Sequence, residues 1–294
     1  MGKTIGVIGL GSIGMRHALN LQELGHRVIG FDPEADETHA NEFEIVESVT
    51  DMRGTNAIVI ASPTNQHAVE ILERPNRPLF VEKPIGCCEV DRVHLGWMLH
   101  DYNPVMMVGY NLRFHACVKE AKRWIAEETP VWATFTCAQK NTKPAYLRDG
   151  VILNWSHEID LALYLLGPAK VVGSSTRLTD GHDDITDILL EHDNGCRTHI
   201  HLDYVTAPEE RHFTIQCNGV RLKADLVNNV LAEIPVNGTI DIQNYPNTFD
   251  DNYVEEMKAF IDRIDGKETI GCTGEEALKV LEICLKVREQ AGLE

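Results

Sequence analysis

The stretch Gly9-Leu10-Gly11-Ser12-Ile13-Gly14 follows an apolar run that begins at Thr4, and it decides the fold of the first part of the chain. A strand that enters a glycine-rich turn and leaves it as a helix is typical of a dinucleotide-binding Rossmann domain. The first glycine allows a tight turn, the second lets backbone amides approach a pyrophosphate, and the third lets helix and strand pack closely. The helix N-terminus also favours phosphate. The predicted dinucleotide contacts in this loop are Gly9, Gly11, Ser12, Ile13 and Gly14.

Asp32 ends the next apolar run, Arg27–Phe31, at the spacing expected for the acidic residue of such a domain. Its carboxylate can accept hydrogen bonds from ribose hydroxyls, but it would repel a 2′-phosphate. No Arg or Lys occurs between Pro33 and Glu37. We therefore predict that the cofactor is NAD rather than NADP. A glycine-rich turn without a ligand is the alternative, and the order of strand, turn, helix and acidic residue argues against it.

The first third of the chain alternates short apolar runs with amphipathic helical stretches. Apolar runs without polar alternation predict strands buried on both faces, and such strands form parallel sheets covered by helices. The predicted strands are Thr4–Leu10, Arg27–Phe31, Ala57–Ala61, Leu79–Glu82 and Val105–Tyr110, and the predicted helices are 13–24, 64–73 and 88–100. We predict an NAD-binding Rossmann domain over residues 1–112.

The pattern changes after Arg113. Helices are predicted at about 116–127 and 155–166, the second ending at Gly167-Pro168, and two more at about 252–265 and 274–291. Strands are predicted near 131–138, 169–178, 184–192, 196–205, 211–218 and 220–226. The last five follow one another without helices between them, which predicts a mostly antiparallel sheet. We predict a second α/β domain over residues 113–294.

The composition limits the possible partners. The 294 residues are 43% hydrophobic and carry a formal net charge of −18, which disfavours nucleic acid and anionic membrane surfaces. No run of about 18 apolar residues could span a membrane, and the apolar start is too short for a signal peptide. We expect a cytoplasmic protein. Its eight cysteines form no C-x-x-C pair, so we expect reduced thiols.

Four further motifs carry a family resemblance. They are Ala61-Ser62-Pro63-Thr64-Asn65-Gln66-His67, Val81-Glu82-Lys83-Pro84, Gly109-Tyr110-Asn111-Leu112-Arg113-Phe114 and Asn154-Trp155-Ser156-His157-Glu158-Ile159-Asp160. With these motifs almost the whole chain resembles the Gfo/Idh/MocA oxidoreductases. Within that family, residues 156–160, the strand ending Leu202-Asp203-Tyr204 and Arg211 look most like members from nonulosonic-acid and other surface-sugar pathways.

The resemblance implies a Rossmann domain joined to an α/β domain with an open antiparallel sheet. It implies that the cofactor lies across the glycine loop, that the substrate lies between the domains, and that hydride is transferred at a carbon–oxygen bond of a sugar or cyclitol. It further implies a homodimer or homotetramer formed through the C-terminal sheet. The implied cofactor contacts are Ser62, Pro63, Thr64, Asn65, His67, Glu82 and Lys83. The implied substrate contacts are Tyr110, Arg113, Asn154, His157 and Asp160.

The catalytic residues predicted from this chemistry are Lys83, His157 and Asp160. Histidine suits proton transfer because its ordinary pKa, roughly 6.5, lies near neutral pH. Lys83 follows a parallel strand at the edge where ligands bind, so it can polarise the substrate oxygen. Asp160 lies one helical turn from His157 and would orient it or bind a hydroxyl. The alternatives are a core histidine, a solvated lysine and a surface carboxylate.

Two departures from the family pattern affect these roles. The aspartate that the family places just before the motif histidine is Asn154 here, and an amide can cap a helix or hold a hydroxyl but cannot transfer a proton. The connection 139–150 is shorter than the family's substrate loop, and its three basic residues would either meet an anionic substrate or form a plain surface loop.

Two further assignments stay open. Arg113 would either bind an anionic group of the substrate or pair with a local acid. His199, His201 and Asp203 share one strand face and suggest a metal, but no fourth ligand is apparent, so no metal is predicted.

The sequence therefore predicts an NAD-dependent dehydrogenase or ketoreductase that acts on a sugar, sugar acid, nucleotide sugar or cyclitol. One alternative is an enzyme that retains NAD and uses transient oxidation to cleave or epimerise a sugar. Another is a dinucleotide-binding regulator without catalytic activity.

Overall fold

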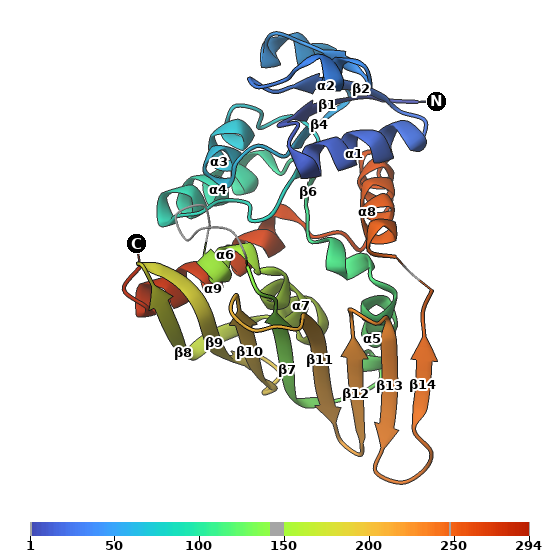
Figure 1. Ribbon diagram of the computed structural model, residues 1–294, viewed down its shortest axis with the longest axis vertical. Helices are drawn as coiled ribbons and strands as arrows, with labels where there is room; N and C mark the ends of the chain where they lie inside the picture. The colour runs from blue at the N-terminus through green and yellow to red at the C-terminus, as the bar shows by residue number, and fades with distance from the viewer. Residues whose placement is uncertain (1, 142–149, 247, 294) are drawn as a thin grey trace. The chain divides into compact units, whose positions relative to one another are not determined.

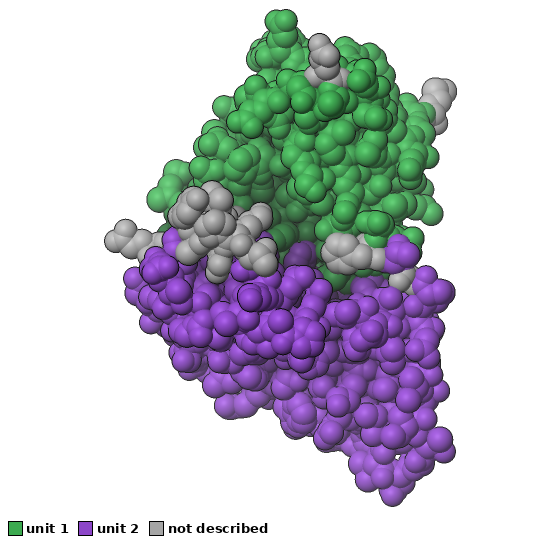
Figure 2. Space-filling model, viewed as in Figure 1, with its two compact units in different colours: residues 1–114, 249–279 green, residues 115–248, 280–294 purple. Residues whose placement is uncertain are grey.

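The computed structural model describes residues 2–141, 150–246 and 248–293, so most of the connection 139–150 lies outside the described residues. The chain divides into two compact units, each built from two segments (Figure 2). Unit 1 contains residues 1–114 and 249–279, and unit 2 contains residues 115–248 and 280–294. Each unit has its own sheet.

The sheet of unit 1 has six parallel strands in the order β3-β2-β1-β4-β5-β6. The strands are β1 (Thr4–Ile8), β2 (Arg27–Phe31), β3 (Glu44–Ile45), β4 (Ala57–Ile60), β5 (Leu79–Val81) and β6 (Met106–Val108). Every residue of β4, β5 and β6 is buried, as expected for strands with helices on both faces. The predicted Rossmann fold is confirmed. The two-residue edge strand β3 was not predicted, because it carries no apolar run.

The helices of unit 1 connect these strands and complete its core. They are α1 (Ser12–Glu23), α2 (Glu37–Ala40), α3 (Thr64–Leu72), α4 (Glu89–Tyr102) and α8 (Phe249–Ile264), with 3-10 turns η1 (Val49–Gly54) and η2 (Asn111–Phe114). Helix α8 packs against α1 and η2. Its Met257 and Phe260 are fully buried in the same apolar cluster as Ile5 and Phe80.

The first segment of unit 1 ends at residue 114, close to the predicted boundary at 112, and the larger difference lies near the C-terminus. Residues 249–279 pack with the Rossmann sheet, although the prediction placed all of 113–294 in the second domain. The amphipathic pattern of α8 showed that the helix has an apolar face, but it did not show which core that face joins.

The sheet of unit 2 has eight strands in the order β14-β13-β12-β11-β7-β10-β9-β8. The strands are β7 (Pro130–Ala138), β8 (Ala169–Thr179), β9 (His182–His192), β10 (Arg197–Asp203), β11 (Glu210–Cys217), β12 (Val220–Asp225), β13 (Val230–Pro235) and β14 (Asp241–Asn244). Only β7 and β10 pair in parallel, and the other pairs are antiparallel. The predicted mostly antiparallel sheet is confirmed.

Helices cover one face of this sheet. The helices are α5 (Ala116–Ile125), α6 (Gly150–Asn154), α7 (His157–Leu166) and α9 (Gly274–Gln290), of which α9 begins in unit 1 and ends in unit 2. Helix α7 packs on β7 and β10, and α5 packs on β12 (Figure 1). Gly167 ends α7 with a φ of 90°, as its position before Pro168 predicted. The opposite face carries exposed side chains such as Leu189, which is 49% exposed, and His199.

Candidate functional site

The glycine loop has the geometry that the sequence predicts. Gly9 has a φ of +86°, and its N–H donates to the carbonyl of Phe31 at 2.9 Å, which joins the loop to the end of β2. A Cβ on Gly9 would lie 2.5 Å from the Ser62 nitrogen, and one on Gly14 would lie 1.9 Å from the Gly9 oxygen. These two positions therefore accept only glycine.

Gly11 lies in a different environment, because a Cβ there would meet no atom within 4 Å. Gly11 is the exposed N-cap of α1, and no side chain caps this helix. The packing of the protein therefore leaves room for a side chain at position 11. A ligand that approaches the backbone at this position would require glycine. Open space beside the amides of a helix N-terminus fits the pyrophosphate of a dinucleotide.

Asp32 is held against the glycine loop by two backbone hydrogen bonds. One carboxylate oxygen accepts the N–H of Leu10 at 2.6 Å, and the other accepts the N–H of Glu34 at 2.8 Å. Each oxygen retains capacity for a further hydrogen bond, because a carboxylate offers about four acceptor sites. The fixed carboxylate beside the loop therefore fits the ribose hydroxyls of NAD.

The segment after β4 lies at the same carboxyl edge of the sheet as the glycine loop, because β4 pairs with β1 in parallel. Pro63 precedes α3, Thr64 is its first residue, and Pro63 and Asn65 are exposed. The Ser62 hydroxyl donates to the carboxylate of Glu70 at 2.7 Å. This arrangement leaves residues 63–65 accessible for a cofactor.

His67 is placed differently from its prediction as a cofactor contact. The ring is 1% exposed. Its Nδ1 lies 2.8 Å from the carbonyl oxygen of Pro84, and its Nε2 lies 2.8 Å from that of Ser62. Both ring nitrogens are therefore engaged by the backbone of the two loops that follow β4 and β5.

Glu82 is also placed differently from its predicted role, because its carboxylate is buried against α1. Its Oε1 lies 2.6 Å from Nε2 of His17, and its Oε2 accepts the backbone N–H of Lys83 at 3.1 Å. Burial alone would raise the pKa of Glu82, but the hydrogen bond and charge of His17 and the charge of Lys83 hold it below its usual value. Gly109 leaves room for this carboxylate, since a Cβ there would lie 2.9 Å from Oε1. Glu82 therefore fixes the backbone of Lys83, and His17 fixes Glu82.

Lys83 itself follows β5 at the carboxyl edge and is partly exposed. The glycine loop follows β1, and Asp32 follows β2, at the same edge of the same sheet. Ligands of open parallel sheets bind at this edge. Unit 1 thus brings the glycine loop, the Asp32 carboxylate and a lysine to one edge.

The predicted substrate contacts of unit 1 are buried. Tyr110 is 1% exposed, and Arg113 is 2% exposed with its Nη1 3.0 Å from the Glu276 carboxylate. Of the two alternatives for Arg113, the structure shows pairing with a local acid. Sequence reasoning did not identify Glu276, because it lies 163 residues away along the chain.

The predicted residues of unit 2 lie at the N-terminus of α7. His157 is the first residue of this helix and is 9% exposed, and Asp160 in the same turn is 1% exposed. Asp160 is therefore not a solvated surface carboxylate. The positive end of the helix dipole disfavours a charged imidazole at position 157, and a neutral imidazole is able to accept a proton.

An ion pair that the sequence did not predict fixes this helix end. The guanidinium of Arg211 on β11 donates to both carboxylate oxygens of Glu158, at 2.7 and 3.2 Å. Burial alone would lower the pKa of Arg211, but the charge and hydrogen bond of Glu158, together with the charges of Cys137 and Glu209, raise it. The bidentate pair ties α7 to β11 one residue after His157.

Asn154 does not cap α7 with its side chain. Its amide donates instead to the hydroxyl of Tyr204, whose ring packs edge-on against Trp155 with centroids 4.4 Å apart. The amide therefore holds a phenol hydroxyl and takes no part in proton transfer.

The exposed face of the sheet in unit 2 gathers histidines around a carboxylate. His199 Nε2 and His201 Nδ1 each lie 2.9 Å from Asp187. Within residues 2–141, 150–246 and 248–293, the side-chain groups close enough to share an ion are Cys87-Cys88-Asp91 and His17-Glu82-Glu256. The face formed by His199, His201 and Asp203 is not one of these groups.

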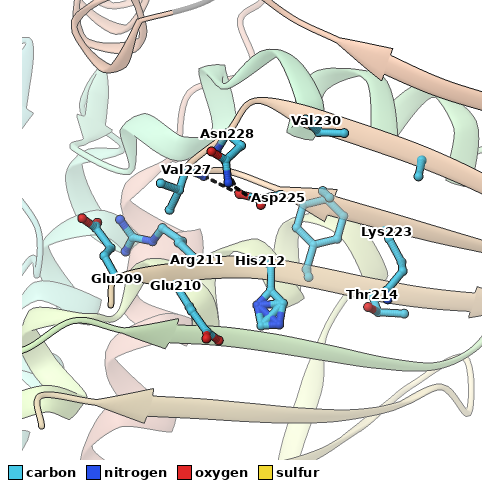
Figure 3. A pocket seen from close by; sticks show the side chains of 13 residues that line it. Glu209, Glu210, Arg211, His212, Thr214, Lys223, Asp225, Val227, Asn228 and Val230 are labelled. Atoms are coloured by element: carbon cyan, nitrogen blue, oxygen red, sulfur yellow. Dashed lines mark hydrogen bonds between the residues drawn. The ribbon is translucent and has the colours of Figure 1, made fainter. Parts of the chain in front are cut away.

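A groove of about 470 Å³ crosses β11, β12 and β13 on unit 2 (Figure 3). His212 and Lys223 line it, and the Asn228 amide donates to Asp225 at 2.7 Å in the turn at its end. None of the predicted catalytic residues lines this groove.

Comparisons with known proteins agree with this architecture. Residues 1–76 match the NAD binding domain of the D-isomer specific 2-hydroxyacid dehydrogenases, and residues 124–222 match the GFO/IDH/MocA C-terminal domain. No curated protein matches the chain. Among the described residues, no helix has both the length and the apolar character needed to cross a membrane.

Three solved structures illustrate the similarity in fold. UDP-N-acetylglucosamine 3-dehydrogenase GnnA from Acidithiobacillus ferrooxidans is 22% identical with a TM-score of 0.87, and the match covers 99% of this chain and 98% of that one. Levoglucosan dehydrogenase in complex with NADH is 15% identical with a TM-score of 0.90, covering 99% and 97%. The WlbA dehydrogenase from Bordetella pertussis, in complex with NADH and UDP-GlcNAcA, is 20% identical with a TM-score of 0.81, covering 99% and 97%.

The resemblance expected from the motifs is thus confirmed: residues 124–222 match the GFO/IDH/MocA C-terminal domain, and they follow a Rossmann sheet whose first part matches an NAD-binding domain.

Proposed function

We propose that the protein is an NAD-dependent oxidoreductase that transfers a hydride between nicotinamide and a C–O centre of a sugar, sugar acid, nucleotide sugar or cyclitol. The observation that carries the proposal is the shared sheet edge of unit 1, where the glycine loop, Asp32 and Lys83 follow parallel strands. A cofactor-binding loop and a cation at one edge suit a reaction in which charge develops on an oxygen beside the cofactor. Structures of similar fold include dehydrogenases of a nucleotide sugar and of levoglucosan.

Bound nicotinamide supplies or accepts the hydride. Lys83 polarises the substrate oxygen and stabilises negative charge on it more strongly in the transition state than in the ground state. His157 takes the hydroxyl proton during oxidation and returns it during reduction. Asp160 orients His157 or accepts a hydrogen bond from a substrate hydroxyl.

The preference for NAD follows from Asp32 in this proposal. Its carboxylate is held in place by the N–H groups of Leu10 and Glu34, so it cannot swing away from a 2′-phosphate without losing both hydrogen bonds. No basic residue between positions 33 and 37 offsets its charge. Hydroxyls are therefore bound at this position, and phosphate is excluded.

The test is a substrate screen that follows absorbance at 340 nm. Sugars, sugar acids, UDP-sugars and cyclitols are offered with NAD, and the corresponding ketones with NADH, to the wild type and to Lys83→Ala. Turnover by the wild type that falls at least ~10²-fold in Lys83→Ala supports the proposal. If NAD stays bound through gel filtration and substrate is converted without net formation of NADH, the protein is instead an enzyme that uses transient oxidation. NAD binding without any conversion would identify a regulator.

The proposal includes an assembly and a location. We expect a cytoplasmic homodimer or homotetramer that associates through the exposed face of the sheet in unit 2. The support is a pair of large apolar side chains exposed on that face, Trp132 and Leu189. Light scattering on the purified protein measures the assembly, and a monomer at micromolar concentration would contradict it.

A further inference from the structure

His67 lies between the two loops that follow β4 and β5. It is the fourth residue of α3, and its ring is 1% exposed. Nδ1 lies 2.8 Å from the Pro84 carbonyl oxygen, and Nε2 lies 2.8 Å from the Ser62 carbonyl oxygen. The ring therefore bridges the backbone of two loops at the carboxyl edge of the sheet.

Both partners of this ring are hydrogen-bond acceptors only. A neutral imidazole carries one N–H, so in either tautomer one ring nitrogen would direct its lone pair at a carbonyl oxygen 2.8 Å away. An imidazolium carries two N–H groups and donates to both oxygens. An unsatisfied polar contact in a buried site costs free energy, so the observed geometry favours the charged ring.

His192 in unit 2 gives an internal comparison. Its Nδ1 lies 2.8 Å from the Gly167 carbonyl oxygen, but its Nε2 lies 2.8 Å from the Thr198 hydroxyl, which can donate. A neutral ring satisfies both contacts, and burial lowers the pKa of His192. Two buried histidines of one chain thus have different sets of partners, and these partners favour a charged ring at His67 and a neutral ring at His192.

The surroundings of His67 supply negative charge. Glu70 lies one turn along α3, and its carboxylate accepts the hydroxyl of Ser62, whose carbonyl His67 also contacts. Burial raises the pKa of Glu70, while the Ser62 hydrogen bond and the charge of His67 oppose that rise. The other charged or titratable groups on the surrounding elements are Glu73 and Arg74 after α3, Glu82 and Lys83 after β5, and Glu89, Asp91, Arg92, His94, His100 and Asp101 in α4.

We infer that His67 is an imidazolium in the native protein and that it is a positioning residue, because its two N–H groups clasp the loops that flank the cofactor edge. The clasp holds the carbonyl of Pro84, the residue that follows Lys83. On the other side of Lys83, His17 holds the carboxylate of Glu82. Two buried histidines from α1 and α3 thus fix the residues before and after Lys83.

The two hydrogen bonds that the His67 ring donates would make kcat depend on pH. When rising pH removes one proton from the ring, one of the two carbonyls loses its donor. In the tautomer that keeps only Nε2–H, this carbonyl is that of Pro84, and the backbone beside Lys83 is then released. The catalytic consequence rests on the proposed function, in which Lys83 acts on the substrate oxygen. The charge of the ring does not depend on that proposal.

The first experiment measures the charge directly. The protein is labelled with ¹⁵N-histidine, and ring nitrogens are recorded through their two-bond couplings to the ring carbon protons at pH 7. His67 is assigned by the signal lost in His67→Asn or His67→Gln, whichever folds, and His192 by the signal lost in His192→Gln. We expect two protonated nitrogens in His67 and one in His192. A singly protonated His67 at pH 7 would overturn the inference whatever the activity.

The second experiment separates positioning from mere stability. The amide of Asn can replace the Nδ1 donor to Pro84, and that of Gln can replace the Nε2 donor to Ser62. We expect His67→Asn to retain kcat within about 3-fold and to lose the decline of kcat at high pH. We expect His67→Gln to lower kcat about 10-fold, with NADH affinity changed less than about 2-fold.

The matched control is His192→Gln, which should keep the wild-type pH profile. Equal kcat in the Asn and Gln variants, or an unchanged pH profile in both, would overturn the positioning role. If no substrate is turned over by the wild type, the proposed function fails, while the NMR result still decides the charge of His67.

Discussion

Arg211 and Glu158 form a buried bidentate ion pair that joins β11 to the first turn of α7, with nitrogen–oxygen distances of 2.7 and 3.2 Å. The Glu158 side chain is 2% exposed and that of Arg211 is 17% exposed. The Glu158 carboxylate is so well enclosed that water cannot take the place of Arg211 when the arginine is removed. It therefore links the stability of unit 2 to the position of His157.

Arg211→Met should destabilise the protein by about 3 kcal/mol, because it leaves the Glu158 carboxylate buried without its counter-ion. Urea denaturation at pH 7 measures the free energy of unfolding. Lys267→Met is the matched control, since it removes the partner of Asp262 from an exposed pair and should change the free energy of unfolding far less than Arg211→Met does. Equal effects in the two variants would contradict a structural role for the Arg211 pair.

NADH should bind at least ~10-fold more tightly than NADPH, a difference of about 1.4 kcal/mol, because the fixed Asp32 carboxylate repels a 2′-phosphate. Asp32→Ser should narrow the difference. Calorimetric titration of both cofactors measures it, and equal or tighter NADPH binding by the wild type would refute the NAD assignment.

His157→Asn should lower kcat by roughly 10²–10⁴-fold and leave NADH affinity nearly unchanged, because an amide cannot transfer the proton. Steady-state kinetics and fluorescence titration of NADH measure the two quantities. A folded variant with near-normal turnover would show that His157 is only a core residue.

Lys83→Ala should reduce kcat/KM by at least ~10²-fold, near 2.7 kcal/mol, with a small change in NADH affinity. Lys83→Arg should restore little activity, because a planar guanidinium does not place a compact charge at the same point. If both act in one step, the Lys83→Ala/His157→Asn double variant should lose less than the product of the single losses. Loss of NADH binding in Lys83→Ala with full turnover in Lys83→Arg would make the lysine a cofactor anchor.

Glu82 should make stability depend on acid pH. Its pKa in the folded protein lies below the ordinary value of 4.5, so its ionised form stabilises the fold above that value and loses this contribution as pH falls through the folded pKa. Glu82→Gln should therefore differ most from the wild type near pH 7 and progressively less below about pH 4. Urea denaturation across pH 3–7 tests this trend. Glu73→Gln removes an exposed carboxylate. Its free energy of unfolding should differ little from that of the wild type, and this difference should not follow the same trend with pH.

The sequence predicted the Rossmann sheet well because β1, β4 and β5 are continuous apolar runs. Such runs are the usual pattern of strands that are buried on both faces of a parallel sheet. It did not predict β13 and β14. Strand β13 is mostly half-buried, and every residue of β14 is exposed, so neither carries a clear apolar pattern. Strand pairing at a sheet edge depends on neighbouring backbone, which the local sequence does not encode.

For the site, the sequence predicted the glycine loop and Asp32 because their spacing reflects the backbone geometry of a single βαβ unit. The contacts of His67 and Glu82 could not be predicted in the same way. Both belong to motifs that suggested cofactor binding, yet their partners are the Pro84 carbonyl and the His17 ring, which lie 17 and 65 residues away. Which side of a loop a polar side chain faces is decided by packing that only the fold reveals.

Helix α8 has a consequence for how the protein is made. A ribosome produces residues 1–114 first, but Met257 and Phe260 of the same core leave it only after all of residues 115–248 have been synthesised. Until then Phe80 and its neighbours lack the rings and side chains that cover them, and exposed apolar surface of this kind favours aggregation and chaperone binding. The nucleotide-binding unit begins the chain, yet it is completed only after the segment inserted into it has been translated.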